Sequence, residues 1–271
     1  MSTELIIALI KAILVLGVLL TNTILLIWFE RKLVAGMQSR VGPDRAGPFG
    51  ILQTVADAIK LLLKEQIMPL KADRAMYLLA PILALVPSFL IFMIIPLGPD
   101  LNIEVGGKNY AVDFVGADLN VGVLYFLALS SIAVYSVVLA GWSSGSKYPL
   151  LGGVRASAQM ISYEAAMGLS LVPVILYAGS LSLVDIVSSQ AGNLSTSIPI
   201  LSSIVSFIPK WNIFPQFIAF GIFFISAVAE VNRAPFDLVE AEQELVGGFH
   251  TEYSGFRFAM FFLAEYIYKY V

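Results

Sequence analysis

Residues 214–266 read FPQFIAFGIFFISAVAEVNRAPFDLVEAEQELVGGFHTEYSGFRFAMFFLAEY. Two apolar runs, typical of membrane helices, flank an acidic loop at 229–255. This loop holds six of the 19 carboxylates in the chain. The stretch therefore predicts adjacent membrane spans joined by a charge cluster that needs a functional explanation. The six acids are Glu230, Asp237, Glu240, Glu242, Glu244 and Glu252.

The overall composition predicts an all-α integral membrane protein, a multi-span helical bundle. Hydrophobic residues make up 58% of the chain and charged residues 13%, against about 25% charged residues in soluble domains. The mean hydropathy is +0.86. The chain has no cysteine and one histidine, His250, which excludes thiolate-bound iron–sulfur clusters, Cys-type zinc sites and bis-histidine haem within it. Any redox cofactor must therefore belong to a partner.

The apolar runs predict five full spans and part of a sixth, because a helix needs about 20 residues to cross the hydrocarbon core. The first run ends in charged residues, so we expect a retained helix rather than a cleaved signal peptide. The Ser-rich segment 180–210 is expected to be an interfacial loop with a short helix, and a further span is the alternative. The sixth run has 16 residues, so we expect a chain that stops within a span. The predicted spans are about residues 5–28, 76–97, 119–141, 158–178, 213–230 and 256–271.

Positive charge is unequally divided between the two sides of these spans. The loops after the first, third and fifth spans hold twelve Lys and Arg residues, whereas Lys108, Lys210 and Lys269 fall on the other side. Because cytoplasmic loops carry the excess of Lys and Arg, we expect the N-terminus outside and the acidic loop 230–255 in the cytoplasm. The twelve are Arg31, Lys32, Arg40, Arg45, Lys60, Lys64, Lys71, Arg74, Lys147, Arg155, Arg233 and Arg257.

The segment between the first two spans contains a predicted amphipathic helix at about 50–66. Its apolar residues recur at helical spacing, while Gln53, Asp57, Lys60 and Lys64 occupy other faces. Such a helix is too polar to span and suits the plane of the membrane interface. The preceding Gly- and Pro-rich sequence VGPDRAGP, residues 41–48, predicts a fixed turn.

Acidic residues inside predicted spans are candidates for proton handling. Glu164 lies about two turns inside the fourth span, where a charge costs at least about 2.5–3.5 kcal/mol; the alternative is a carboxyl that reaches water from the helix end. Glu230 ends the fifth span and Glu265 lies in the sixth. Glu30 and Arg31 end the first span, where a simple boundary anchor is an equal alternative.

Within the acidic loop, Pro235 suits the first turn of a helix. If 237–246 is helical, Asp237, Glu240 and Glu244 share one face and Glu242 points elsewhere. Buried together, such acids raise one another's pKa values and can share protons. The alternative is a solvated acidic helix, but interleaved apolar residues and the flanking arginines favour proton handling.

Three strings resemble a known family, the quinone-channel membrane subunit (H subunit) of bacterial respiratory complex I, NADH:quinone oxidoreductase. They are ERKLVAGMQSRVGPDRAGPFGILQTVADAIKLLLKE at 30–65, RASAQMISYEAAMGLSL at 155–171 and EVNRAPFDLVEAEQELVGGFHTEYSGFRFAMFFLAEY at 230–266. The resemblance extends over essentially the whole chain. Family members have eight spans, so the five spans and partial sixth predicted here imply an incomplete chain.

The resemblance implies a quinone-access tunnel and an acidic path that couples quinone reduction to proton translocation in the bacterial inner membrane. It implies partners in both the hydrophilic peripheral arm, which carries FMN and iron–sulfur clusters, and the membrane arm. It implies no nucleic acid, and no cofactor or metal in this chain. The implied quinone-binding residues are Arg31, Arg40, Asp57, Arg233 and Phe236, and the implied coupling acids are Glu164, Glu230, Asp237, Glu240, Glu242 and Glu244.

Three other interpretations remain. The same fold serves as the anchor of membrane-bound hydrogenases or deazaflavin-linked dehydrogenases. An ion-coupled transporter would be expected to show internal repeats, and none is evident in the sequence. A purely structural anchor gives no reason for Glu164, Glu265 or the acidic loop.

Overall fold

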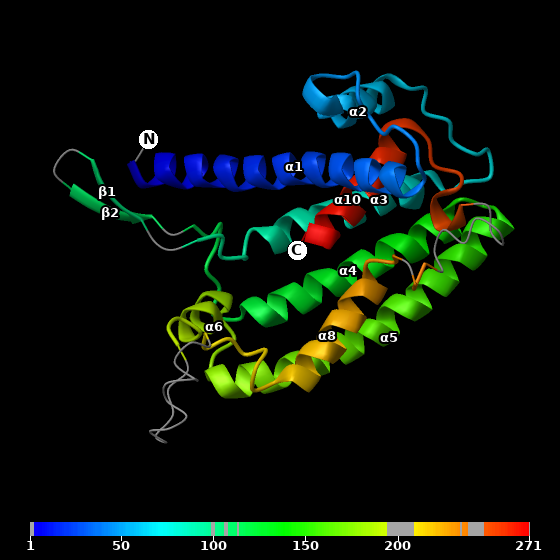
Figure 1. The fold of residues 1–271 in the computed structure, drawn as a ribbon. Helices are drawn as coiled ribbons and strands as arrows, with labels where there is room; N and C mark the ends of the chain where they lie inside the picture. The colour runs from blue at the N-terminus through cyan, green and yellow to red at the C-terminus, as the bar shows by residue number, and fades with distance from the viewer. Residues whose placement is uncertain are drawn as a thin grey trace.

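The computed structural model describes residues 3–98, 101–105, 108–112, 114–193, 209–233, 235–237 and 247–270. Helices dominate, as Figure 1 shows, and the predicted all-α membrane bundle is confirmed. One feature was not predicted, a two-stranded antiparallel hairpin that pairs Leu101 with Val112 and Val105 with Lys108. The elements are α1 (Thr3–Met37), η1 (Pro48–Gly50), α2 (Gln53–Leu63), α3 (Arg74–Phe92), β1 (Leu101–Val105), β2 (Lys108–Val112), α4 (Gly122–Ser143), α5 (Lys147–Ala178), α6 (Leu183–Ser189), α8 (Phe217–Glu230), η2 (Gly248–His250) and α10 (Gly255–Tyr270).

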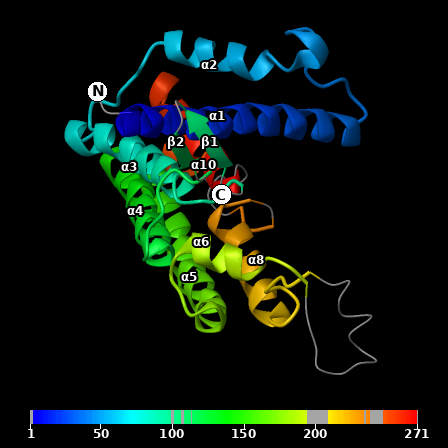
Figure 2. The same ribbon diagram turned by 90° about the vertical axis from the view of Figure 1, so that its left-hand side faces the viewer.

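The helices pack in a chain of neighbours rather than around one axis. Helix α4 packs between α3 and α5, and α8 packs on α5. Helix α10 packs on α3 and also contacts α1 and α2. In Figures 1 and 2, α2 lies on the outer side of α1, and in Figure 1 the β1–β2 hairpin projects beyond the end of α1. The acidic loop therefore follows a helix that packs on α5 and precedes a helix that packs on α3.

Four of the described helices are long and apolar enough to cross a membrane: α1, α3, α4 and α5. Helix α8 is apolar but has 14 residues, or roughly 21 Å at 1.5 Å per residue, which is less than the hydrocarbon core. Helix α1 has 35 residues, so it exceeds the core and must tilt or project from it. The chain is therefore a membrane protein.

Helix ends differ from the predicted spans because hydropathy detects the apolar part of a helix and not its continuation into water. The span predicted at 5–28 lies within α1, which extends to Met37. The span predicted at 158–178 lies within α5, which begins at Lys147 with Pro149 in its first turn. The amphipathic helix predicted at 50–66 corresponds to η1 and α2, which end at Leu63.

The buried core joins α3, α4, α5 and α10 to the end of the acidic loop. The rings of Tyr77 and Tyr253 stack with centroids 4.1 Å apart. The Tyr77 hydroxyl donates to the Glu252 carbonyl at 2.8 Å, and the Tyr253 hydroxyl donates to the Tyr77 carbonyl at 3.2 Å. Phe261 meets the Tyr253 ring edge-on. These contacts hold the end of the acidic loop against α3 and α10.

A glycine on α5 allows the 3-10 turn η2 to approach the helix backbone. A Cβ at Gly152 would lie 2.8 Å from the Gly248 backbone, which is shorter than any allowed contact. The close approach fixes the depth at which η2, and with it His250, sits against α5.

We predict that Gly152→Ala destabilises the protein by about 1–3 kcal/mol, as overpacked sites do, because the added methyl must displace η2. Gly168→Ala in the same helix is the matched control. Its Cβ would meet only the Leu127 side chain at 3.6 Å, so the better helix propensity should leave stability unchanged or raise it by up to about 1 kcal/mol. Thermal unfolding in detergent measures both, and equal shifts would refute the packing argument.

Candidate functional site

Two neighbouring serines of α4 hold carboxyl groups that arrive from two other helices. Ser130 donates to Oε1 of Glu230, at the end of α8. Ser131 donates to Oε1 of Glu164, on α5, and the Leu127 carbonyl, 3.0 Å away, is a competing acceptor for the same proton. Both carboxyls are partly buried. The structure therefore brings two of the sequence-predicted acids to adjacent positions on one helix, inside the bundle.

Glu230 also lies between two cavities. One, of about 90 Å³, is lined by Glu230, His250 and Tyr268 among mainly apolar residues. The other, of about 350 Å³, is lined by Glu230, Tyr268, Arg233 and Lys269, with phenylalanines among its other lining residues. A proton or a water molecule that reaches either cavity can therefore approach the same carboxyl group.

Arg233 is the centre of a charge cluster that joins α1, α10 and the loop after α8. Its guanidinium lies 3.4 Å from the Glu30 carboxylate and 3.1 Å from that of Glu265. Lys269 shares the same Glu265 oxygen at 3.0 Å. The Tyr266 hydroxyl donates to Glu30 at 2.8 Å. Burial lowers the pKa of Arg233, but the charges of Glu265 and Glu30 outweigh it and hold the pKa above its usual value.

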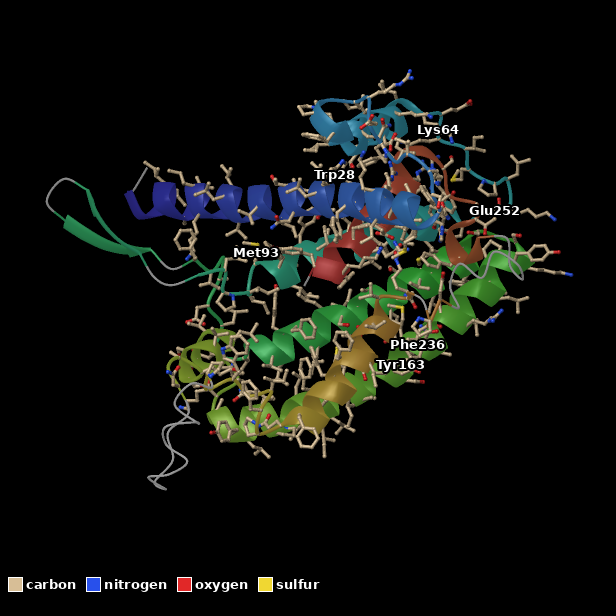
Figure 3. The ribbon with its side chains drawn as sticks, in the orientation of Figure 1. Trp28, Lys64, Met93, Tyr163, Phe236 and Glu252 are labelled. Atoms are coloured by element: carbon tan, nitrogen blue, oxygen red, sulfur yellow. The ribbon has the colours of Figure 1, made fainter. Side chains whose placement is uncertain are left out.

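A second pair links α1 to the amphipathic helix α2. Arg31 donates to the carboxylate of Asp57, which also accepts from Gln53 at 2.9 Å. Burial raises the pKa of Asp57, but hydrogen bonds from Arg31 and Gln53 and nearby positive charges outweigh it, so the pKa is lowered. Trp28 strengthens the junction by donating from Nε1 to the Phe49 carbonyl at 2.9 Å. Figure 3 shows Trp28 on α1.

Phe236 is placed against α5. Its ring meets that of Tyr163 edge-on, with centroids 5.3 Å apart, and the two labelled side chains lie together in Figure 3. The buried Gln159 amide nitrogen, which has two N–H groups, donates to the carbonyls of Ala229 and Phe236, both at 2.8 Å, and Asn232 Oδ1 lies 3.2 Å from the same nitrogen. One amide group of α5 thus fixes the start of the acidic loop.

Other predicted site residues are not brought together. Arg40 is exposed, and its guanidinium donates to the neighbouring Gln38. Asp237 lies where its charge acts on His250. Glu240, Glu242 and Glu244, and most of the helix predicted at 237–246, fall outside the described residues. Among the residues that the structure describes, no three His, Asp or Glu side chains form a group suited to a metal ion.

The site also contains residues that sequence reasoning missed: Ser130, Ser131, Gln159, Tyr266 and Tyr268. Serines within an apolar helix usually donate to the carbonyl one turn earlier, so the pair carried no evident signal. Tyrosines near a helix end are common at membrane interfaces. These side chains are distinguished from others of their kind only by their contacts with groups on other helices, which the tertiary structure shows.

Helices of membrane-spanning length, carboxyls held within their bundle and the charge cluster around Arg233 define a polytopic membrane protein with buried charge. The chain belongs to the NADH dehydrogenase family, whose model matches residues 10–271. It is 49% identical to the H subunit of NADH-quinone oxidoreductase from Brevibacillus brevis, over 96% of this chain and 69% of that relative. It is 52% identical to the corresponding protein of Frankia alni over 96% and 53%, and 49% identical to that of Thermomicrobium roseum over 97% and 74%.

These comparisons confirm the family that the sequence motifs resembled. The chain spans about half of the Frankia alni relative and about seven tenths of the other two. The relatives named are components of an oxidoreductase complex, as predicted.

We predict that Asp57→Asn loosens α2 from α1, by about 0.5–1 kcal/mol because the pair is only partly buried. In the folded protein the pKa of Asp57 is depressed from the ordinary value of 3.8, so the stabilisation is present above that value and is lost as the pH falls through the lower, folded pKa. Hydrogen exchange of the α2 amides measures the docking. Asp44→Asn, which removes the exposed contact to Lys32, is the control and should leave exchange in α2 unchanged. Equal exchange in both variants would contradict the assignment.

Proposed function

We propose that this chain is the membrane component of an NADH:quinone oxidoreductase that forms the quinone-access tunnel and couples quinone reduction to proton translocation. The relatives' names support the oxidoreductase and its quinone acceptor. The observation that carries the coupling role is the convergence of Glu164 and Glu230 on Ser131 and Ser130 within an apolar bundle. No feature of the described residues favours a hydrogenase or deazaflavin-linked anchor over this interpretation.

The coupling follows from the electrostatics of buried carboxyls. Reduction of a quinone by two electrons takes up two protons at its headgroup, and any proton drawn from a nearby acid leaves that acid as a negatively charged carboxylate. Charges act strongly on one another at low dielectric, so such a change alters the proton affinity of nearby acids and can pass from one to the next. Asp237, Glu230 and Glu164 provide successive steps from the loop into the bundle, with Glu240, Glu242 and Glu244 as further members.

The quinone side of the proposal rests on the junction between α1 and α2. The exposed side chains of Leu52, Ile59 and Leu62 give this part of the chain an apolar surface that suits lipid and an isoprenoid tail. Arg31 and Asp57 stand at the same junction and offer polar groups to a headgroup. The proposed quinone-binding set is completed by Arg40, Arg233 and Phe236.

In this proposal the N-terminus lies outside the bacterial inner membrane and the acidic loop lies in the cytoplasm, as the distribution of Lys and Arg indicates. The peripheral arm docks on the cytoplasmic loops and carries the FMN and iron–sulfur clusters that deliver electrons. Other proteins of the membrane arm receive the coupling signal.

We predict that Glu230→Gln and Asp237→Asn each reduce proton pumping linked to quinone reduction by about tenfold or more, toward the lower range for loss of a proton-transfer group. The amide keeps the shape of the side chain and removes its charge. Glu65→Gln, at an exposed position after α2, is the control and should pump normally. Pumping is measured with the intact complex in proteoliposomes. If both site variants assemble into the complex and show normal turnover and normal proton pumping, the proposal is contradicted.

We predict that Ser130→Ala perturbs Glu230 directly, because a hydrogen bond to a charged group contributes about 1.5–3 kcal/mol. Infrared difference spectra of the intact complex, in which the Glu230 band is identified by its loss in Glu230→Gln, should show a shifted carboxyl stretch. Ser130→Thr retains the hydroxyl and should restore the wild-type frequency. An unshifted band in Ser130→Ala would show that the hydrogen bond does not tune this carboxyl.

A further inference from the structure

Three buried polar atoms without hydrogen-bond partners among the described residues belong to side chains that line one cavity. They are Oε2 of Glu230, Nδ1 of His250 and the hydroxyl of Tyr268. The side chains come from α8, η2 and α10, so no local sequence pattern places them together. A buried polar group without a hydrogen bond destabilises the folded protein. Because three such groups line the same cavity, we infer that they share a hydrogen-bond partner inside it.

Among the described residues, the rest of the wall adds only Ser136, Asn232 and Glu265 as polar side chains. Most of the other lining residues are apolar, including Phe249, Phe258, Phe261 and Phe262. The cavity offers about 90 Å³ to the centres of water molecules, and one ordered water needs about 10–15 Å³ of such volume. The cavity therefore has room for several water molecules, each within reach of a polar atom or another water.

The polar groups of the cavity wall differ in their connections. His250 belongs to the acidic loop and lies where the charge of Asp237 acts on it. Burial lowers its pKa to about 4, so the ring is neutral near pH 7, with one nitrogen able to donate and the other to accept. Glu230 is fixed through Oε1 by Ser130, which leaves Oε2 for the cavity.

Tyr268 is the third polar group of the wall. It lines both this cavity and the larger one, as Glu230 does. Its hydroxyl also lies close enough to Glu230 and Glu164 for their charges to act on it. A phenol can donate one hydrogen bond and accept another, which suits it to hold a water in position beside the free oxygen of Glu230.

We propose that this cavity is a binding site for a chain of ordered water that joins His250 Nδ1 to Glu230 Oε2, with Tyr268 as the residue that positions it. The inference rests on the proposed proton-coupling function and specifies how the loop exchanges protons with the first membrane-embedded acid. His250 and Tyr268 are positioning residues for the water, and Glu230 is the proton acceptor.

The first test is a high-resolution cryo-EM map of the intact complex. The expected result is contiguous water density within hydrogen-bond distance of all three atoms. Tyr268→Phe, which keeps the ring, should lose the water beside Glu230 and slow proton pumping severalfold. A dry wild-type cavity would overturn the proposal, as would an unchanged water chain and unchanged pumping in Tyr268→Phe.

A cavity-filling pair of variants on α4 separates blocked water from a packing defect. Ala133 lines the cavity, whereas Ala140, two turns further along and also buried, is not among its lining residues. Ala133→Val should remove water density and slow pumping severalfold, while Ala140→Val should keep both. Should Ala133→Val assemble poorly, the Tyr268→Phe map decides the matter. If Ala133→Val expels the water and the two variants still pump protons at equal rates, the proposed water route is refuted.

The outcomes also distinguish this inference from the proposed function. If the cavity contains ordered water and Glu230→Gln pumps protons normally, Glu230 has no coupling role, but the hydration site is confirmed. A dry cavity with defective pumping in Glu230→Gln would keep the coupling role and require another proton route.

Discussion

The fold and the site both depend on carboxyl groups held inside an apolar helical bundle. Glu164 and Glu230 arrive on different helices, yet each accepts a hydrogen bond from one of two adjacent serines of α4. An ionisable group at this depth is costly unless it has polar partners, so the packing of α5 and α8 against α4 must be accurate. That requirement makes the site sensitive to small movements of three helices.

The charge cluster around Arg233 connects this site to the rest of the molecule. The Arg233 guanidinium bridges Glu30, about two turns before the end of α1, and Glu265 on α10. The start of the acidic loop is therefore tied to two helices, one of them distant in the sequence. Gln159 of α5 fixes the same segment through its backbone carbonyls. These contacts fix the positions of the charged groups at the start of the loop.

The end of the loop is held equally firmly. The stacked Tyr77 and Tyr253 and the close approach of Gly152 to Gly248 place η2 against α3 and α5. His250 thereby lines a cavity that it shares with Glu230. The acidic loop is therefore anchored at both of its described ends, as the proposed coupling role requires.

The sequence by itself determined the class of protein, the apolar spans, the amphipathic helix and the family, because hydropathy and long motifs are local properties of the chain. It also indicated that Glu164, Glu230 and Arg233 need partners, since isolated charges are unfavourable in an apolar setting. Only the tertiary structure decided which partners they have. No local sequence pattern identifies the partners Ser130, Ser131, Gln159 and Tyr268. These residues gain their roles when helices that are far apart in the sequence pack together.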